Sequence, residues 1–264
     1  MKFRPILLIM VAAWCALPLI AQDYTAPDFS SDDEQKEETI PDWLVELSNL
    51  PQRSRQIYTG AFAAAKKAYA KGYMVDCIAH LNTCELYTRK NPHVWNLRAS
   101  ALIAQKRFDE ALPLLEQVKA QSPSDSVLQL NYSLLYLGKG EYDKCIEVTD
   151  ALMESIRYKK MEGLTHSLLF RKFLCRVMQE RIDEARELVK HISPIDDSPL
   201  YYYCEAVFAL IEGNRREAMK SLNVADSIYS GVGMLVNYKQ AMTFSGVSDK
   251  YSLENQSSSV HEKP

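Results

Sequence analysis

The chain has 264 residues, of which 31 are Lys or Arg and 34 are Asp or Glu, so its formal net charge is -3. Proteins that bind duplex nucleic acid usually carry an excess of basic residues, so the composition argues against nucleic acid as a partner. Glycine (9) and proline (11) are few, and apolar residues rarely alternate with polar ones. Both features favour an all-α chain over a β-sandwich or a β-barrel.

The first residues have the pattern of an export signal. Lys2 and Arg4 give a basic start, and residues 5–21 contain no charged side chain. This pattern predicts a signal peptide over residues 1–21 with cleavage after Ala21. We therefore expect export to the periplasm, the cell surface or the medium.

Two alternatives to a cleaved signal are open. An uncleaved membrane anchor would need a longer apolar stretch, and Pro18 interrupts this one. A lipid-modified Cys15 would be expected to follow a small residue, whereas Trp14 stands there. After cleavage, no integral membrane span is expected.

An acidic segment follows the apolar start and precedes the first helical pattern. Residues 22–40 are polar and acidic with few apolar side chains, which predicts a disordered spacer. Trp43, Leu44 and Leu47 then follow at helical spacing and predict a short leading helix. From here to residue 246 we expect one helical repeat domain, 41–246.

A period of 34 residues organises the middle of the chain. Four columns of similar residues keep this spacing: Cys77, Ala111, Cys145; Ala65, Ala99, Ser133; Met74, Phe108, Tyr142; and Ile78, Leu112, Ile146. Self-similarity at this period is typical of arrays of helical hairpins. Such arrays bury their cores between neighbouring units and present an extended surface to a partner.

Five hairpin units are expected, at residues 58–91, 92–125, 126–159, 166–198 and 199–232. The period lengthens by about six residues near 158–164, which predicts a longer second helix in the third unit or a longer loop there. Met234 to Phe244 could form a capping helix. Residues 247–264 are predicted to be a disordered tail.

The second unit resembles a tetratricopeptide repeat. The residues that carry the resemblance are Trp95, Arg98, Ala99, Leu102, Ala111, Leu115 and Pro123. The first, third and fifth units resemble it at Ala65 and Cys77, at Ser133 and Cys145, and at Ala206 and Ala218, whereas Phe173 is unusual in the fourth. The resemblance, to a tetratricopeptide protein of the exported bacterial type, implies an α-solenoid of about five stacked hairpins between a leading helix and a C-terminal capping helix.

By this resemblance, one stripe of each unit's first helix lines a concave groove. The groove residues are Phe62, Lys66, Tyr69, Asn96, Ser100, Ile103, Leu130, Leu134, Leu137, Phe170, Leu174, Val177, Tyr203, Val207 and Leu210. An exposed apolar surface of this size usually marks a binding site, and an amphipathic helix or extended peptide would fit it. The alternative is that residues 233–246 fold back and cover the groove, since helices that are apolar all round are usually buried.

Other residue clusters suggest weaker possibilities. Cys77, His80 and Cys84 share a helix face that a soft metal could use, but they lack an evident fourth ligand and both cysteines sit at packing positions. Arg157, Lys159 and Lys160, with Arg171 and Lys172, form a basic cluster that could meet an acidic partner or remain a solvated helix face. Tyr201, Tyr203 and Phe170 could form an aromatic pocket for a small ligand or a glycan.

No phosphate-binding loop, nucleophile elbow or zinc-protease motif occurs in the sequence. The sequence therefore predicts an exported, non-enzymatic scaffold that needs no cofactor or metal and binds a protein or peptide in the groove. The alternative function is binding of a small ligand or glycan, and an enzyme with an unrecognised site is a third class. The oligomeric state stays open.

Overall fold

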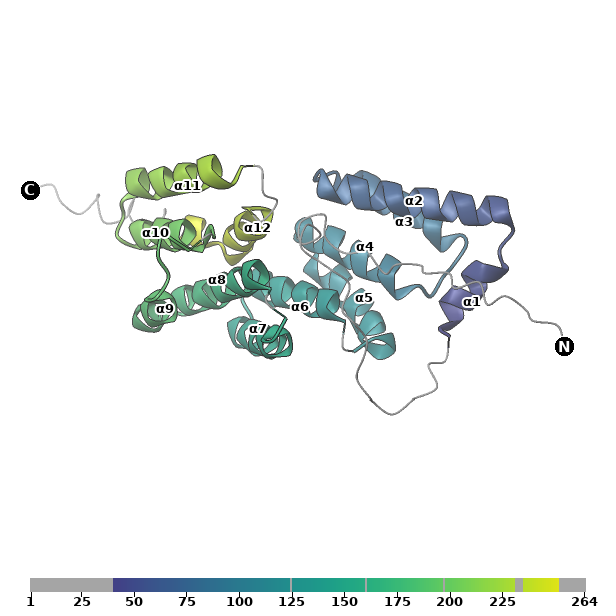
Figure 1. Cartoon of the computed structure of the whole chain (residues 1–264), viewed down its shortest axis with the longest axis horizontal. Coiled ribbons are helices and arrows are strands. Elements are labelled where there is room, and N and C mark those ends of the chain that lie inside the picture. Colours follow the sequence, from purple (N-terminus) through teal and green to yellow (C-terminus); the bar gives the residue numbers. More distant parts are fainter. Residues whose placement is uncertain (1–39, 124, 160, 197, 231–234, 252–264) are drawn as a thin grey trace, which may run out of the picture.

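The structure is a computed structural model that describes residues 40–123, 125–159, 161–196, 198–230 and 235–251. Within these ranges the regular structure is helical and contains no strand (Figure 1). Neighbouring helices pack in pairs, so the predicted all-α solenoid class is confirmed. The predicted signal peptide, nearly all of the acidic spacer and residues 252–264 lie outside the described residues.

The helices follow the chain in the order shown in Figure 1. Their bounds are α1 Asp42–Asn49, α2 Gln52–Ala70, α3 Met74–Glu85, α4 Pro92–Ala104, α5 Phe108–Gln121, α6 Ser126–Lys139, α7 Tyr142–Ile156, α8 Glu162–Met178, α9 Ile182–Val189, α10 Leu200–Ile211, α11 Arg215–Tyr229 and α12 Leu235–Ser245. A further short helical segment covers residues 247–251.

Successive hairpins stack through their first helices. The pairs are α2–α3, α4–α5, α6–α7, α8–α9 and α10–α11, and each first helix packs on the next, from α2 through α4, α6 and α8 to α10. The second helices α3, α5 and α7 also pack on the first helix of the following unit. The first helices therefore form a continuous inner row, and the second helices lie outside it.

Repeated caps begin the first helices of two consecutive units. The Asn91 side chain accepts a hydrogen bond from the backbone N–H of His93 at 2.9 Å, and Asp125 accepts one from Val127 at 2.7 Å. Each cap satisfies a backbone donor that has no partner inside its own helix. Asn91 and Asp125 are 34 residues apart, so the period fixes where helices start as well as what they bury.

The small-residue columns of the sequence are the packed interior of the hairpins. Ala65, Ala99 and Ser133 are fully buried, and so are the cysteines and alanine of the second column, Cys77, Ala111 and Cys145. Small side chains let the two helices of a pair approach closely. The larger residues beside them then fill the remaining space.

The break in the period lies between α7 and α8. α7 ends at Ile156 and α8 begins at Glu162, and α8 has 17 residues where α6 has 14. Most of the additional residues therefore lie at the start of α8, the first helix of the fourth unit. The expected longer second helix of the third unit was wrong, because α7 has 15 residues where α5 has 14.

The C-terminal segment differs from the prediction. Residues 247–251 were expected to belong to a disordered tail, but Val247 and Tyr251 are buried in the main core. The Tyr251 hydroxyl donates to the Val177 carbonyl at 3.3 Å, and the Lys250 ammonium lies 2.8 Å from the Glu180 carboxylate. The expectation was wrong for these residues because two apolar side chains one helical turn apart can bury together on α8.

Candidate functional site: the concave face and helix α12

The concave face is the inner surface of the row α2, α4, α6, α8 and α10. Helix α12 packs against α6 and α8 on this row, and Figure 1 shows it between the α10–α11 pair and the centre of the molecule. The predicted groove is consequently divided into a C-terminal part beneath α12 and an N-terminal part on α2 and α4.

The C-terminal part of the groove is interior. The Tyr238 ring of α12 lies 5.2 Å from the Phe170 ring and 5.1 Å from the Tyr203 ring, and its hydroxyl is 3.3 Å from Ser198 Oγ. The predicted groove residues of α8 and α10 are all buried: Phe170, Leu174, Val177, Tyr203, Val207 and Leu210. The alternative reading, in which the segment after residue 232 covers the groove, describes this part of the molecule.

The same contacts remove the aromatic pocket expected for a small ligand or glycan. Phe170 and Tyr203 would have formed its walls, and Tyr238 fills the space between them. Tyr201 instead stacks edge-to-face on Tyr202, with ring centroids 5.3 Å apart. The Phe170 and Tyr203 rings contribute to packing because Tyr238 from α12 completes their cluster.

The third unit lies under the end of α12. Its groove residues Leu134 and Leu137 are buried in apolar clusters that include α12 residues, and the Phe244 ring meets the Phe108 ring edge-to-face at 6.1 Å. Leu130 is also buried, but in a cluster with residues of α7 and α8. Ile103 of α4 belongs to the same apolar cluster as Phe244. The cover therefore extends from α10 to the last turn of α4.

The N-terminal part of the concave face is polar. Asn131 Nδ2 donates to Asn96 Oδ1 at 2.5 Å, Ser100 Oγ lies 3.0 Å from Asn131 Oδ1, and Asn96 Nδ2 lies 3.5 Å from Asp125 Oδ2. Asn96, Ser100 and Asn131 are buried. Two predicted groove residues thus hold α4 against α6, and their hydrogen bonds fix the floor of this part of the face.

Half-exposed and exposed side chains stand at the rim of this polar floor. Phe62 is buried, while Lys66 is half-buried with its ammonium 5.5 Å from the centre of the Phe62 ring. Tyr69 is also half-buried, and burial raises the pKa of its hydroxyl against the opposing effect of a hydrogen bond with Gln240. Tyr69 therefore marks the boundary between the polar face and α12.

Two residues of this face were missed from the sequence. His93 lies one turn before Asn96 on the same side of α4. Thr59 lies on α2, 34 residues before His93. The Trp43 ring of α1 packs edge-to-face on His93 at 5.3 Å. Burial lowers the pKa of His93, with the Asp125 charge opposing it, so its imidazole is neutral at pH 7. Continuing the predicted groove stripe of α2 and of α4 by one helical turn toward the N-terminus of each helix would have identified both residues.

Arg171 lies inside the molecule, apart from the basic cluster expected around it. Its side chain is 2% exposed, and its Nη1 donates to the Leu130 carbonyl at 3.1 Å and to Ser133 Oγ. Burial lowers the pKa of Arg171 to about 10, with the opposite influence of Cys145, Tyr69 and Cys175. Among the described residues its Nε has no hydrogen-bond partner.

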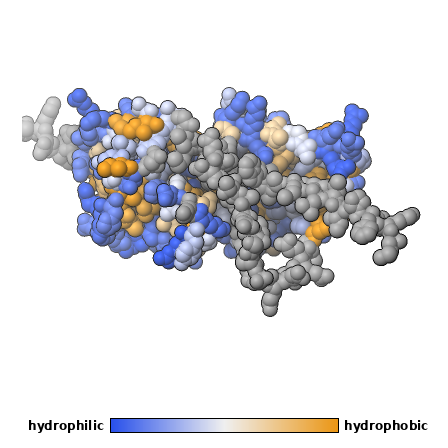
Figure 2. Space-filling view, in the orientation of Figure 1, coloured by the Kyte–Doolittle hydropathy of each residue, from blue (hydrophilic) through white to orange (hydrophobic). Residues whose placement is uncertain are grey.

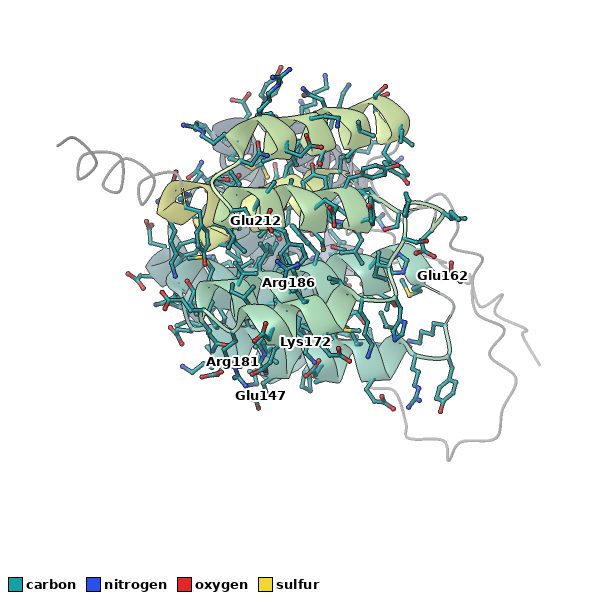
Figure 3. All side chains as sticks on the ribbon, turned by 90° about the vertical axis from the view of Figure 1, so that its left-hand side faces the viewer. Glu147, Glu162, Lys172, Arg181, Arg186 and Glu212 are labelled. Atoms are coloured by element: carbon teal, nitrogen blue, oxygen red, sulfur yellow. The ribbon has the colours of Figure 1, made fainter. Side chains whose placement is uncertain are left out.

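Two other members of the expected basic cluster pair with acidic residues of α7, and Lys160 lies outside the described residues. Lys172 pairs with Asp150 at 2.7 Å on the surface shown in Figure 3, whereas Arg157 lies 3.4 Å from Glu154. Consecutive helical residues point about 100° apart, which is why Arg171 faces inward and Lys172 outward. Arg171 is therefore not part of a basic surface with Lys172.

The candidate metal ligands are packing residues. Cys77 and Cys84 are fully buried, and burial raises the pKa of each thiol to about 11. A thiol binds a metal as the thiolate, so this environment opposes metal binding. Across the described ranges, no group of three His, Cys, Asp or Glu side chains is placed to hold a metal ion.

Among the described residues, a shallow surface pocket of about 340 Å³ is lined by Glu85, Arg89, Trp95 and Gln117. Trp95 is half-buried there, which explains how a repeat-pattern tryptophan can contact both core and solvent. On the face seen in Figure 2, the coloured surface is mostly hydrophilic, with separate hydrophobic areas. No helix among the described residues has the length and apolar character needed to cross a membrane.

The comparisons with known proteins agree with the helical repeat. Residues 102–157, from the end of α4 to the end of α7, match the tetratricopeptide repeat family model. Neither the comparison with curated proteins nor the comparison with solved structures found a match. This central segment therefore carries a tetratricopeptide repeat, within a chain whose described helices continue the same paired packing on both sides.

Proposed function

We propose that this protein is an exported, non-enzymatic scaffold that binds a protein or peptide partner on the N-terminal part of its concave face. Tetratricopeptide repeats generally mediate protein–protein interactions, and the match at residues 102–157 supports that role here. Their stacked all-α fold is typically a scaffold, which supports a function without catalysis.

The observation that carries the location is the position of α12. This helix fills the concave face over α6 and α8, and its last aromatic residue reaches the end of α4. The inner surfaces of α2 and α4 lie beyond it. We call the side chains Thr59, Lys66, Tyr69 and His93 the N-terminal concave surface; Thr59 is exposed and the other three are half-buried.

The chemistry of this surface suits a peptide. It offers an ammonium group, a neutral imidazole and a hydroxyl above a floor that hydrogen bonds already fix in place, beside the Tyr69 phenol that already bonds to Gln240. A peptide backbone has a donor and an acceptor at most residues, so an extended segment can use such mixed groups. A prepared floor also lowers the entropy that binding would otherwise cost.

Export is part of the same proposal. The basic start, the uncharged stretch of residues 5–21 and the acidic residues after it support a cleaved signal. N-terminal sequencing of the mature protein from the cells that make it is expected to start at Gln22. A chain that starts at Met1 and fractionates with the cytosol would contradict export.

Comparative purification tests the partner site. We expect wild-type protein to retain a specific protein from its own cells, and Thr59→Trp with Lys66→Glu to reduce the recovery of that protein by at least about tenfold. The matched control is Glu147→Lys on the outer helix α7, where the side chain is exposed. If the concave variant retains the partner and the α7 variant loses it, the proposed surface is wrong.

A further inference from the structure

Helix α2 carries basic charges and no acidic ones. The stretch 52–71, which covers α2 and the residue after it, has five basic residues: Arg53, Arg55, Lys66, Lys67 and Lys71. All of them except Lys66 are exposed. The four exposed ones form no ion pair with another described residue, whereas basic side chains of later units do, as Lys139 does with Asp109 at 2.8 Å. We call these five residues the basic face of α2.

The surface between these charges is low and open. Gly60, Ala63 and Ala70 are exposed on α2, and a Cβ atom added at Gly60 would meet no other atom within 4 Å. α2 is the first helix of the inner row, with α3 and α4 as its packing neighbours (Figure 1). An extended chain can therefore lie along α2 with its backbone close to the helix.

The basic face adjoins the N-terminal concave surface. Arg55, Thr59 and Lys66 point in directions within about 40° of one another around the axis of α2, since successive helical residues turn by about 100°. Any chain bound along the basic face consequently lies over Thr59 and Lys66 as well.

The protein has an acidic segment that begins next to this face. Residues 22–39 contain one basic residue, Lys36, and seven acidic ones: Asp23, Asp28, Asp32, Asp33, Glu34, Glu37 and Glu38. This segment continues into α1 at residue 40. The Trp43 ring of α1 lies 5.3 Å from the ring of His93, which belongs to the N-terminal concave surface. The acidic segment therefore meets the described structure beside the concave face.

The acidic segment is long enough to follow α2 from end to end. Eighteen extended residues span up to about 60 Å, whereas the 19 residues of α2 form a helix about 28 Å long, and the eight residues of α1 add about 12 Å. Attachment to the same chain gives a short segment an effective concentration of about millimolar at a nearby surface. Opposite charge and this proximity favour the protein's own segment over a separate acidic molecule.

We propose that residues 22–39 bind along the basic face of α2 in the same molecule. Their carboxylates pair with the guanidinium and ammonium groups of that face, and the bound segment covers Thr59 and Lys66. A partner that uses the N-terminal concave surface then has to displace the segment. This competition rests on the proposed function, but the intramolecular contact does not.

Zero-length crosslinking tests the contact directly. A carbodiimide joins a carboxylate to a lysine amine only where the two groups touch. The full chain, purified from the cells that make it, is treated at low ionic strength and digested with trypsin. We expect the tryptic peptide that ends at Lys36 to be linked to peptide 56–67 through Lys66 or to peptide 67–71 through Lys67.

Two described lysines provide the controls for this reaction. Lys172 and Asp150 are 2.7 Å apart, so their peptides are expected to be joined in every sample. Lys119 is exposed on outer helix α5, and we expect no link from it to the peptide that ends at Lys36.

Charge reversal identifies the surface that the segment uses. Arg53→Glu with Arg55→Glu keeps both reactive lysines, and we expect it to lower the yield of the link at least about fivefold, as 0.5 M NaCl should in the wild-type chain by screening. Arg215→Glu with Arg216→Glu, at the exposed start of α11, makes the same change in net charge and should alter the yield less than about twofold. Equal yields from the two variants would overturn the proposal.

Isotope mixing distinguishes contact within one molecule from contact between two. Unlabelled and nitrogen-15-labelled chains are mixed in equal amounts before crosslinking, and we expect each linked pair to carry one isotope only. Mixed pairs as abundant as uniform ones would overturn the proposal in favour of a second copy. Absence of the link while Lys172 and Asp150 are joined would also overturn it, and would leave the proposed partner surface to its own test.

Discussion

Single residues at the hairpin turns show how strictly the repeat is kept. Gly72, Gly140 and Gly213 have positive φ angles of 80°, 74° and 77°, and the equivalent residues Lys106 and Glu180 have φ angles of 59° and 61°. Every hairpin therefore uses the same left-handed residue between its two helices. Glycine adopts this conformation without the steric cost that a Cβ atom brings.

Lys106→Gly should therefore stabilise the protein. Relief of the left-handed strain exceeds the extra freedom that glycine has in the unfolded chain, and we expect a gain of about 0.5–1 kcal/mol. Lys119→Gly is the matched control, because Lys119 lies inside α5, where glycine should cost about 1 kcal/mol. Urea unfolding of both variants measures the difference, and a Lys106→Gly variant less stable than wild type would contradict the argument.

The buried thiols of Cys77 and Cys84 on α3 predict slow alkylation of the folded protein and a free energy of unfolding that depends on pH. Burial raises the pKa of Cys77 and Cys84 to about 11 from an unfolded value near 9, so the folded state favours the protonated thiols. Between about pH 9 and 11 the unfolded chain binds fewer protons than the folded chain, and the contribution of these thiols to stability falls as pH rises.

Native alkylation measures this protection. We expect iodoacetamide at pH 8 to leave both cysteines of tryptic peptide 72–89 unmodified in the folded protein, and to modify both of them in urea. Rapid labelling of Cys77 in the native state at the rate of a free thiol would show that the α2–α3 interior is open.

A charged substitution at Leu174 distinguishes a buried C-terminal groove from an exposed one. The residue was predicted to face an open groove, where an added charge would meet water. It is fully buried beneath α12, so Leu174→Asp should place a charge in an apolar core and cost at least about 4 kcal/mol. Leu86→Asp, at a leucine that is 80% exposed, should change the free energy of unfolding by less than about 0.5 kcal/mol. Equal melting temperatures for the two variants would indicate an open C-terminal groove.

At the scale of elements, α12 is the segment that most changes the prediction from sequence. A helix was expected near Met234 to Phe244, and its place on the concave face was one of two alternatives. The period could not decide between them, because α12 is outside the repeat and has no equivalent in the other units. The sequence evidence for a covered groove lay in α8 and α10, which carry apolar side chains on nearly every face.

Tyr238 is the residue through which α12 can be tested. Its ring is fully buried against Phe170 and Tyr203, so Tyr238→Ala should cost about 3–5 kcal/mol through lost contacts and a cavity. Val236→Ala, two residues earlier on the opposite side of α12 and 43% exposed, should cost less than about 1 kcal/mol. Chemical unfolding of both variants is the measurement. A Tyr238→Ala protein as stable as Val236→Ala would mean that α12 does not cover the groove in solution.

The hairpin elements themselves were largely predictable. Small residues at Ala65, Ala99 and Ser133 and the caps at Asn91 and Asp125 recur with the period, and local sequence is sufficient to determine them. Long-range polar contacts were not predictable in this way. The bond from Asn131 to Asn96 and the inward path of Arg171 depend on which helices meet, and no single helix pattern contains that information.

In the whole molecule, the two parts of the concave face have different roles. The C-terminal part binds the protein's own α12 and forms the largest core cluster. The N-terminal part keeps a polar floor with half-exposed side chains at its rim. The C-terminal end of the molecule, seen in Figure 3, carries paired charges such as Arg186 with Glu212 at 3.5 Å, which suit a solvated surface.

Site-specific photo-crosslinking in the cells that make the protein tests this central claim most directly. A benzophenone amino acid is placed singly at Thr59 or Lys66 on the N-terminal concave surface, and at Glu147 on outer helix α7 as the control. We predict that both concave positions form a covalent adduct with the same partner protein and that the α7 position forms none. Adducts at Glu147 alone, or no adduct at either concave position while the partner still co-purifies, would contradict the claim that this part of the concave face binds the partner.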